Sequence, residues 1–238
     1  MAPGPRRLVA LAASAAALIA GAAIALAAAA TVSRSHASAV ADAVEVRHGD
    51  LSGYQQAANP MTAQERTLAT REAKCIGEAP PGDAWALAQS PAFTDTLSNG
   101  FSTTVSSQTE VLPAAALVAR DFAAVTGPHG IPCLKSDLAE TLRSALSSSE
   151  SLVSITGARQ AALLPKADRS FVDRFTIVIN EAQNGKSTEV QLFADAIGIT
   201  VGQLEIDLTV ETVLAPPAPS LERRLAELLL ARAQAALR

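Results

Sequence analysis

The sequence predicts an α+β domain: an antiparallel sheet, built from a three-strand meander at 171–214 and one or two further strands, with helices packed mainly on one face. Three observations carry this prediction. Asn184-Gly185 is the preferred dipeptide of a two-residue hairpin turn, and Gly202-Gln203 marks a second reversal. After Pro216-Pro217, a helix that starts near Ser220 carries a leucine stripe and can cover the sheet.

The two reversals fix the strand register. The first pairs Ile179 with Val190, Ile177 with Leu192 and Phe175 with Ala194; the second pairs Val201 with Leu204, Ile199 with Ile206 and Ile197 with Leu208. In the shared strand the apolar partners have even numbers before residue 195 and odd numbers after it, so we predict a β-bulge at Ala194-Asp195-Ala196. The acidic row Glu205, Asp207 and Glu211 is then expected to face water.

The upstream elements follow from local signals. Thr62 and Glu65 form a capping box, which predicts a helix from Ala63 to Lys74. Prolines and glycines make residues 77–100 a long irregular connection around Trp85. Alternation predicts a strand over 101–111, and further signals predict helices over 113–126 and 137–147 and a strand over 152–164.

The first 39 residues have the three parts of a bacterial export signal. Arg6-Arg7 precedes an uncharged run from Leu8 to Val32, and Ala37-Ser38-Ala39 offers a small-residue cleavage site. At about 1.5 Å per residue the run spans roughly 37 Å as a helix, enough to cross a bilayer. Cleavage and retention as a transmembrane anchor both stay open. We therefore expect residues 1–39 to be a signal or anchor, 40–61 a flexible lead-in and 62–238 one extracytoplasmic domain.

The charge balance excludes one class of partner. Loss of residues 1–39 would leave 16 basic against 23 acidic residues and shift the formal net charge from −4 to −7. An acidic surface disfavours nucleic acid and anionic headgroups. Membrane contact is expected only through the N-terminal segment, if that segment is not cleaved.

The two cysteines, Cys75 and Cys133, both lie in the exported part. In an oxidising compartment such a pair predicts a disulfide. Two buried free thiols are the alternative, and a metal site is disfavoured because two thiolates alone do not complete the ligand shell of a zinc ion. No other metal site and no cofactor is expected.

The order of these elements resembles a known family. A cysteine at a helix end, an alternating strand, a helix with a second cysteine, and a meander followed by Leu221-Glu-Arg-Arg-Leu-Ala-Glu-Leu are similar to exported actinobacterial envelope proteins of the LpqN/LpqT kind, which have a PsbP-like α/β/α sandwich. The resemblance implies a cell-envelope protein that acts by binding. The chain lacks their lipobox cysteine. A weaker likeness is to the PknH-type extracellular sensor domain, whose pattern has two disulfides where this chain can form one.

Apparent catalytic motifs fail in their context. Gly185-Lys186-Ser187 resembles the end of a P-loop, but strand residues follow it where a helix is required. The chain has no G-x-S-x-G elbow, and the three histidines, His36, His48 and His129, fall in the signal region, the lead-in and a Gly/Pro turn. No catalytic residue is assigned.

The sequence thus predicts a non-catalytic exported envelope domain that binds a partner protein or a small hydrophobic ligand. The alternative is an exported hydrolase whose site is assembled only in the fold. Trp85 is either a buried loop plug or an anchor for a partner.

Overall fold

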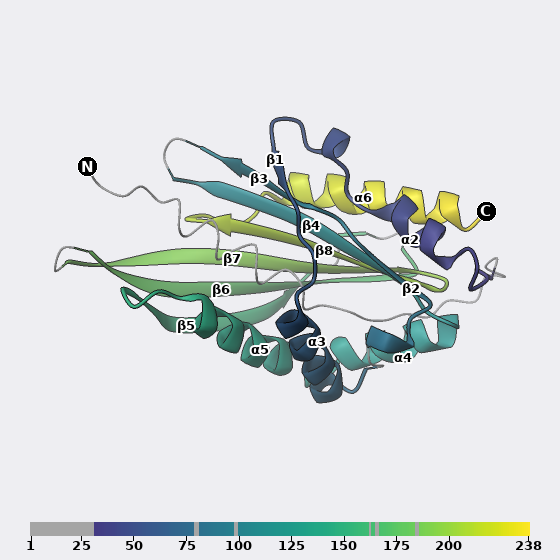
Figure 1. Cartoon of the computed structure of the whole chain (residues 1–238), viewed down its shortest axis with the longest axis horizontal. Coiled ribbons are helices and arrows are strands. Elements are labelled where there is room, and N and C mark those ends of the chain that lie inside the picture. The colour runs from purple at the N-terminus through teal and green to yellow at the C-terminus, as the bar shows by residue number, and fades with distance from the viewer. Residues whose placement is uncertain (1–30, 79–80, 98–99, 162, 165–166, 184–185) are drawn as a thin grey trace.

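The computed structural model describes residues 31–78, 81–97, 100–161, 163–164, 167–183 and 186–238. Within them, five helices flank an open antiparallel sheet of eight strands, which confirms the α+β class (Figure 1). The helices are α2 Ala37–Val44, α3 Ala63–Ile76, α4 Ala115–Val125, α5 Gly130–Ala145 and α6 Pro219–Ala236. The strands are β1 Gln55–Ala57, β2 Ala86–Gln89, β3 Ala92–Thr96, β4 Ser102–Val111, β5 Glu150–Gln160, β6 Arg169–Gln183, β7 Lys186–Val201 and β8 Leu204–Val213.

The sheet runs in the order β1-β3-β4-β8-β7-β6-β5, and β2 pairs separately with β4. The predicted meander is therefore confirmed as β6, β7 and β8. All six predicted cross-strand pairs are present, from Phe175 opposite Ala194 to Val201 opposite Leu204. Gly202 turns β7 into β8 with φ +59°, a conformation that glycine adopts without a steric cost. Asn184-Gly185 lies outside the described residues.

The predicted bulge at Ala194-Asp195-Ala196 is wrong. The β6–β7 and β7–β8 ladders run without a shift through these residues, and the irregularity of this part of the sheet lies in β5, between Leu152 and Ser154. The switch in apolar parity along β7 has another cause. Even-numbered residues face one helix layer and odd-numbered residues face the other, so the strand needs no extra residue.

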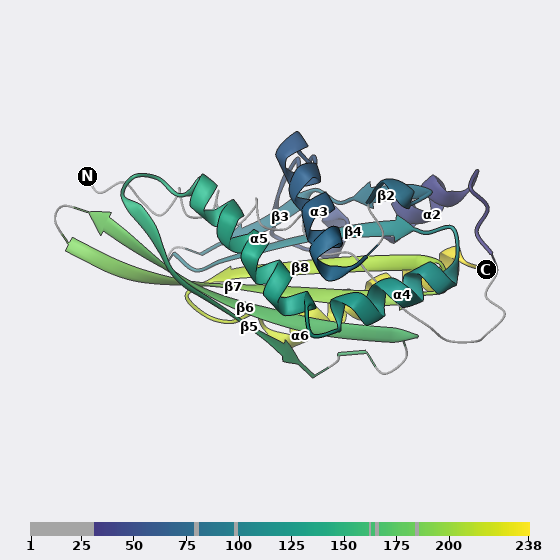
Figure 2. The same cartoon turned by 90° about the horizontal axis from the view of Figure 1, so that it is seen from below.

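Two hydrophobic cores result, one on each face of the sheet. Figures 1 and 2 show the helices that flank the sheet. The α6 core joins α2 and α6 to residues of β4, β7 and β8 that include Ile197, Ile206 and Leu208. The α5 core joins α3, α4 and α5 to Phe175, Leu192 and their neighbours on β6 and β7. The helices are thus divided between both faces and do not pack mainly on one. The row Glu205, Asp207 and Glu211 is buried, and its predicted contact with water is corrected.

Residues before Thr62 differ from the flexible lead-in expected at 40–61. Ala37, Ala41 and Val44 of α2 are fully buried in the α6 core. The Val32 amide donates a 2.8 Å hydrogen bond to Gln203 Oε1. Among the described residues, the folded part therefore includes Val32, seven residues before the predicted cleavage point after Ala39.

The region 77–100 also differs from the irregular connection predicted there, because it contains β2 and β3. Their short apolar stretches lie among the prolines and glycines that suggest a loop. Trp85 lies just before β2, is partly buried and packs against the α6 core. This position agrees with the loop-plug interpretation.

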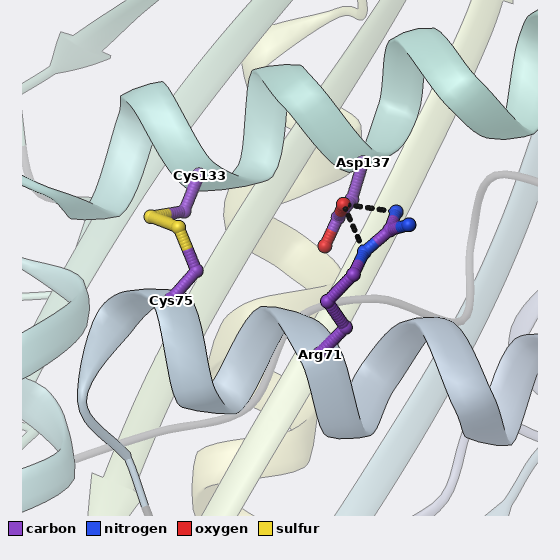
Figure 3. Close-up of a disulfide and its surroundings, with 4 residues drawn as sticks. All are labelled: Arg71, Cys75, Cys133 and Asp137. Atoms are coloured by element: carbon purple, nitrogen blue, oxygen red, sulfur yellow. Dashed lines mark hydrogen bonds and ion pairs between the residues drawn. A yellow bond between two sulfur atoms is a disulfide. The ribbon is translucent and has the colours of Figure 1, made fainter.

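A disulfide and an ion pair hold α3 against α5 (Figure 3). The predicted capping box begins α3: the Thr62 amide donates to Glu65 Oε2 at 2.5 Å, and the Glu65 amide donates to Thr62 Oγ1 at 3.2 Å. Near the other end of α3, a disulfide joins Cys75 to Cys133, with their Cα atoms 5.9 Å apart. One turn away, Arg71 Nε donates to Asp137 Oδ1 at 3.0 Å.

Candidate functional site

A layer of buried carboxyl groups lies on the face of β4 and β8 that the α3, α4 and α5 helices cover. We call it the acidic layer; its members are Glu72, Glu78, Glu110, Asp121, Glu205 and Asp207. Glu110 and Glu205 are directly opposite each other in the β4–β8 ladder, and Asp207 is opposite Gln108. Asp207 keeps 7% of its surface exposed and Glu205 keeps 2%.

Burial determines the protonation of this layer. Burial and, to a smaller extent, the neighbouring Asp121 raise the pKa of Glu110 to about 7. Burial raises the pKa of Glu78 to about 10, with Asp207, Asp121 and Glu110 contributing in the same direction. The pKa values of Glu72, Glu205 and Asp207 are also well above their ordinary range, through burial and then the nearby carboxyls. Much of the layer is therefore protonated at neutral pH.

The layer has unused hydrogen-bonding capacity. Buried oxygens of Glu72, Glu78, Glu205 and Asp207 lack a hydrogen-bond partner, as does Gln108 Oε1. In the part of the chain that the structure describes, however, no group of three or more Asp, Glu, His or Cys side chains has a geometry suited to a metal ion. The buried carboxyl groups of the acidic layer can therefore bind and release protons.

A groove of about 480 Å³ lies between α5 and the edge strand β5. One face of α5 lines it with side chains spaced four residues apart: Ile131, Lys135, Ala139 and Arg143. Ile131 and Ala139 are apolar, whereas the two basic side chains are exposed and stand roughly 12 Å apart along the helix. The groove therefore combines an apolar surface with two positive charges.

Gly157 of β5 completes the groove. A Cβ atom at this position would lie 2.8 Å from Ile131 Cγ2 and 2.9 Å from the Phe175 ring. The absence of a side chain thus allows α5 to pack closely on the edge of the sheet.

A second pocket, of about 340 Å³, brings Glu45, His48 and Ser90 together beside β2 and β3. Burial raises the pKa of Glu45 to about 7, against the opposing effect of its bond with Ser107. The Ser107 hydroxyl donates to Glu45 Oε2 at 2.5 Å and accepts the Val46 amide at 2.9 Å. Ser107 is itself buried, so this network holds the end of α2 against β4 and does not present a nucleophile.

The described residues do not assemble a catalytic triad. His36 lies 2.7 Å from Ser33 Oγ, three residues away on an exposed turn. His129 precedes α5 without capping it through its side chain. Lys186 and Ser187 form the start of β7, which agrees with the interpretation of Gly185-Lys186-Ser187 as part of a hairpin.

None of the described helices is long and apolar enough to cross a membrane. The uncharged run that begins at Leu8 lies almost entirely outside the described residues.

Sequence reasoning missed both the groove and the acidic layer. The groove had a signal, the four-residue spacing from Ile131 to Arg143. The acidic layer also had a signal, the row that includes Glu205 and Asp207, but alternation in a strand does not reveal whether helices cover its polar face.

Comparisons with known proteins place the chain far from characterised relatives. No family model matches it, and no curated protein matches it. A solved structure, the extracellular domain of PknH from Mycobacterium tuberculosis, is similar in fold with a TM-score of 0.46 and 11% sequence identity, covering 86% of this chain and 98% of that one. This similarity is consistent with the weaker of the two predicted likenesses, whereas that to LpqN/LpqT proteins finds no support. At this level of similarity the match carries no functional argument.

Proposed function

We propose that this protein is a non-catalytic domain outside the cytoplasm that binds an anionic amphipathic molecule in the groove between α5 and β5. The observation that carries the proposal is the lining of the groove. Apolar contacts at Ile131 and Ala139 suit a hydrocarbon chain, and Lys135 and Arg143 suit an anionic head group. This ligand is more specific than the small hydrophobic ligand that the sequence predicts. It also departs from the expectation that the acidic net charge disfavours anionic head groups, because the groove itself is lined by two basic side chains and no carboxylate.

Binding is favoured over catalysis by the chemistry of the polar clusters. The acidic layer is covered by helices, and the Ser107 hydroxyl is already engaged with Glu45 and Val46. Neither cluster places an activated nucleophile beside an open cavity, which a hydrolase requires. The groove, in contrast, is open and has no carboxylate among its lining residues.

The groove is tested by calorimetry with dodecanoate below its micellar concentration. We expect dodecanoate to bind about tenfold or more tightly than dodecyltrimethylammonium, because the head-group charge is reversed. Ala139→Trp should fill the groove and abolish binding, and Lys135→Glu should weaken it by about tenfold. Lys186→Glu on β7 is the matched charge control and should bind as the wild type does. Equal binding of the anion and the cation, or no effect of Ala139→Trp, would overturn the assignment.

For the N-terminus, we propose that the export segment is either kept as an anchor or cut before Val32. Cleavage after Ala39 would remove the Val32 amide from Gln203 Oε1 and the fully buried Ala37 from the α6 core. Loss of these contacts should cost roughly 3–5 kcal/mol of unfolding free energy.

A C-terminal reporter that is active only outside the cytoplasm, followed by mass measurement of the active fusion, tests location and processing together. The fusion should be active, and its N-terminus should lie upstream of Val32. An inactive fusion would refute the location, and a mature chain that begins at Val40 would refute the proposed processing.

A further inference from the structure

Helix α3 forms a cover over the acidic layer. Its buried face carries Leu68, Glu72, Ala73 and Ile76, and Glu78 follows directly after the helix ends at Gly77, where φ is +95°. The helix therefore places two carboxyl groups, from Glu72 and Glu78, among those of β4 and β8. A helix that only shielded the sheet from water would not need two buried carboxyl groups on its inner side.

The attachments of α3 to α5 are of a different kind from its contacts with the acidic layer. Cys75 is bonded to Cys133, and Arg71 pairs with Asp137 and, at 2.7 Å, with Glu140. These links join α3 to α5 and not to the strands of the sheet. They provide a tether on which the helix can loosen without being lost.

The charged groups around the layer are mostly acidic. Glu72 and Glu78 face it from α3, Glu110 from β4, and Glu205 and Asp207 from β8. Asp121 and its partner Arg120 approach from α4, with Arg120 Nη2 2.8 Å from Asp121 Oδ1, and Asp137 approaches from α5. Arg120 has half its side chain in solvent, so it screens the layer only from the edge.

We propose that α3 is a pH-sensitive lid: it is sealed over the acidic layer while the carboxyls of Glu72, Glu78, Glu110, Glu205 and Asp207 carry protons, and it loosens on its disulfide tether as they ionise. The unpartnered oxygens of Glu205 and Asp207 are buried beneath this lid, together with Gln108 Oε1. Ionised, they would repel the carboxylates of α3 at low dielectric. Solvation of the layer by water relieves that repulsion, and loosening of α3 admits the water.

The sign of the effect follows from linkage. A carboxyl whose pKa is raised on folding stabilises the sealed state below its unfolded value, and this stabilisation is lost as the pH rises through the folded value. For Glu110 the window runs from about 4.5 to about 7, and for Glu78 it extends to about 10. The lid should therefore be sealed at pH 5.5 and loosened at pH 8.5.

Hydrogen exchange at pH 5.5 and 8.5, corrected for the intrinsic exchange rates, tests the proposal on the disulfide-intact protein. The amides of α3 should lose about tenfold or more protection at the higher pH, while amides of α6 should change by less than about twofold. The variant Glu78→Gln/Glu110→Gln keeps the shape of both side chains but removes the two ionisations that define this pH window, so its α3 protection should depend much less on pH than that of the wild type. Glu189→Gln, at an exposed position on β7, should behave as the wild type does.

Three results would overturn the proposal. Equal loss of protection in α3 and α6 would indicate global unfolding in place of a lid. A pH response that persists in the double variant would place the titrating groups elsewhere. Restored protection on addition of millimolar Ca²⁺ at pH 8.5 would make the layer a cation site and not a proton-controlled seal.

Discussion

Replacement of Leu208 by Asp should destabilise the protein by about 5 kcal/mol or more and prevent folding of a domain of ordinary stability. Leu208 is fully buried in the α6 core, where it faces the α6 helix from the centre of β8. The variant removes the hydrocarbon and places a carboxyl group among aliphatic side chains, with no basic partner on that face of the strand. Thermal and urea melts measure the loss.

Val153→Asp is the matched control, because it makes a comparable change in a strand at a side chain that is 53% exposed. It should cost less than about 1 kcal/mol. Similar losses at Leu208 and Val153 would mean that the sheet does not face α6 as described.

Replacement of Arg174 by Met should lower the free energy of unfolding by about 3–5 kcal/mol, because it leaves the buried carboxylate of Asp195 without its partner. Arg174 Nε donates to Asp195 Oδ1 at 2.7 Å across β6 and β7, and its Nη2 lies 3.8 Å from Glu222 Oε1 on α6. Asp195 is completely buried. Burial and, after it, the neighbouring Asp195 raise the pKa of Glu222 to about 8, against the opposing effect of Arg174.

The double variant Arg174→Met/Asp195→Leu separates the loss of a contact from the exposure of an unpaired charge. It removes both partners and should recover most of the stability lost in Arg174→Met, as measured by urea unfolding at pH 8. If the losses in Arg174→Met and in the single variant Asp195→Leu simply add in the double variant, the two side chains do not stabilise each other as described.

The strand register could be predicted from the sequence because two tight turns and six apolar pairs constrain it independently. Which faces of the sheet are covered by helices could not be predicted from the sequence. Ile197 and Leu192 have opposite parity in β7, and this pattern has two explanations: a bulge that keeps one dry face, or two helix layers that make both faces dry. The division of the helices decides between them in the structure, because α6 and α2 cover the face of Ile197 whereas α5 covers the face of Leu192, and the sequence does not reveal which face each helix takes.

The candidate sites depend on contacts between elements that are distant in the chain. The groove needs Gly157 of β5 beside Ile131 of α5, and the acidic layer needs Glu72 of α3 above Asp207 of β8. A strand residue such as Asp207 has the same local sequence whether it faces water or a helix. For that reason its row could be found from the sequence but its burial could not.

Native mass spectrometry of the protein taken from the cell envelope, compared with Ala139→Trp prepared in the same way, shows whether the α5–β5 groove holds a ligand. We expect the wild type to retain an anionic amphipathic molecule, and the variant, whose groove is filled, to be free of it while remaining folded. A wild type without a bound molecule, or the same bound molecule on both proteins, would contradict the assignment of the α5–β5 groove as the binding site.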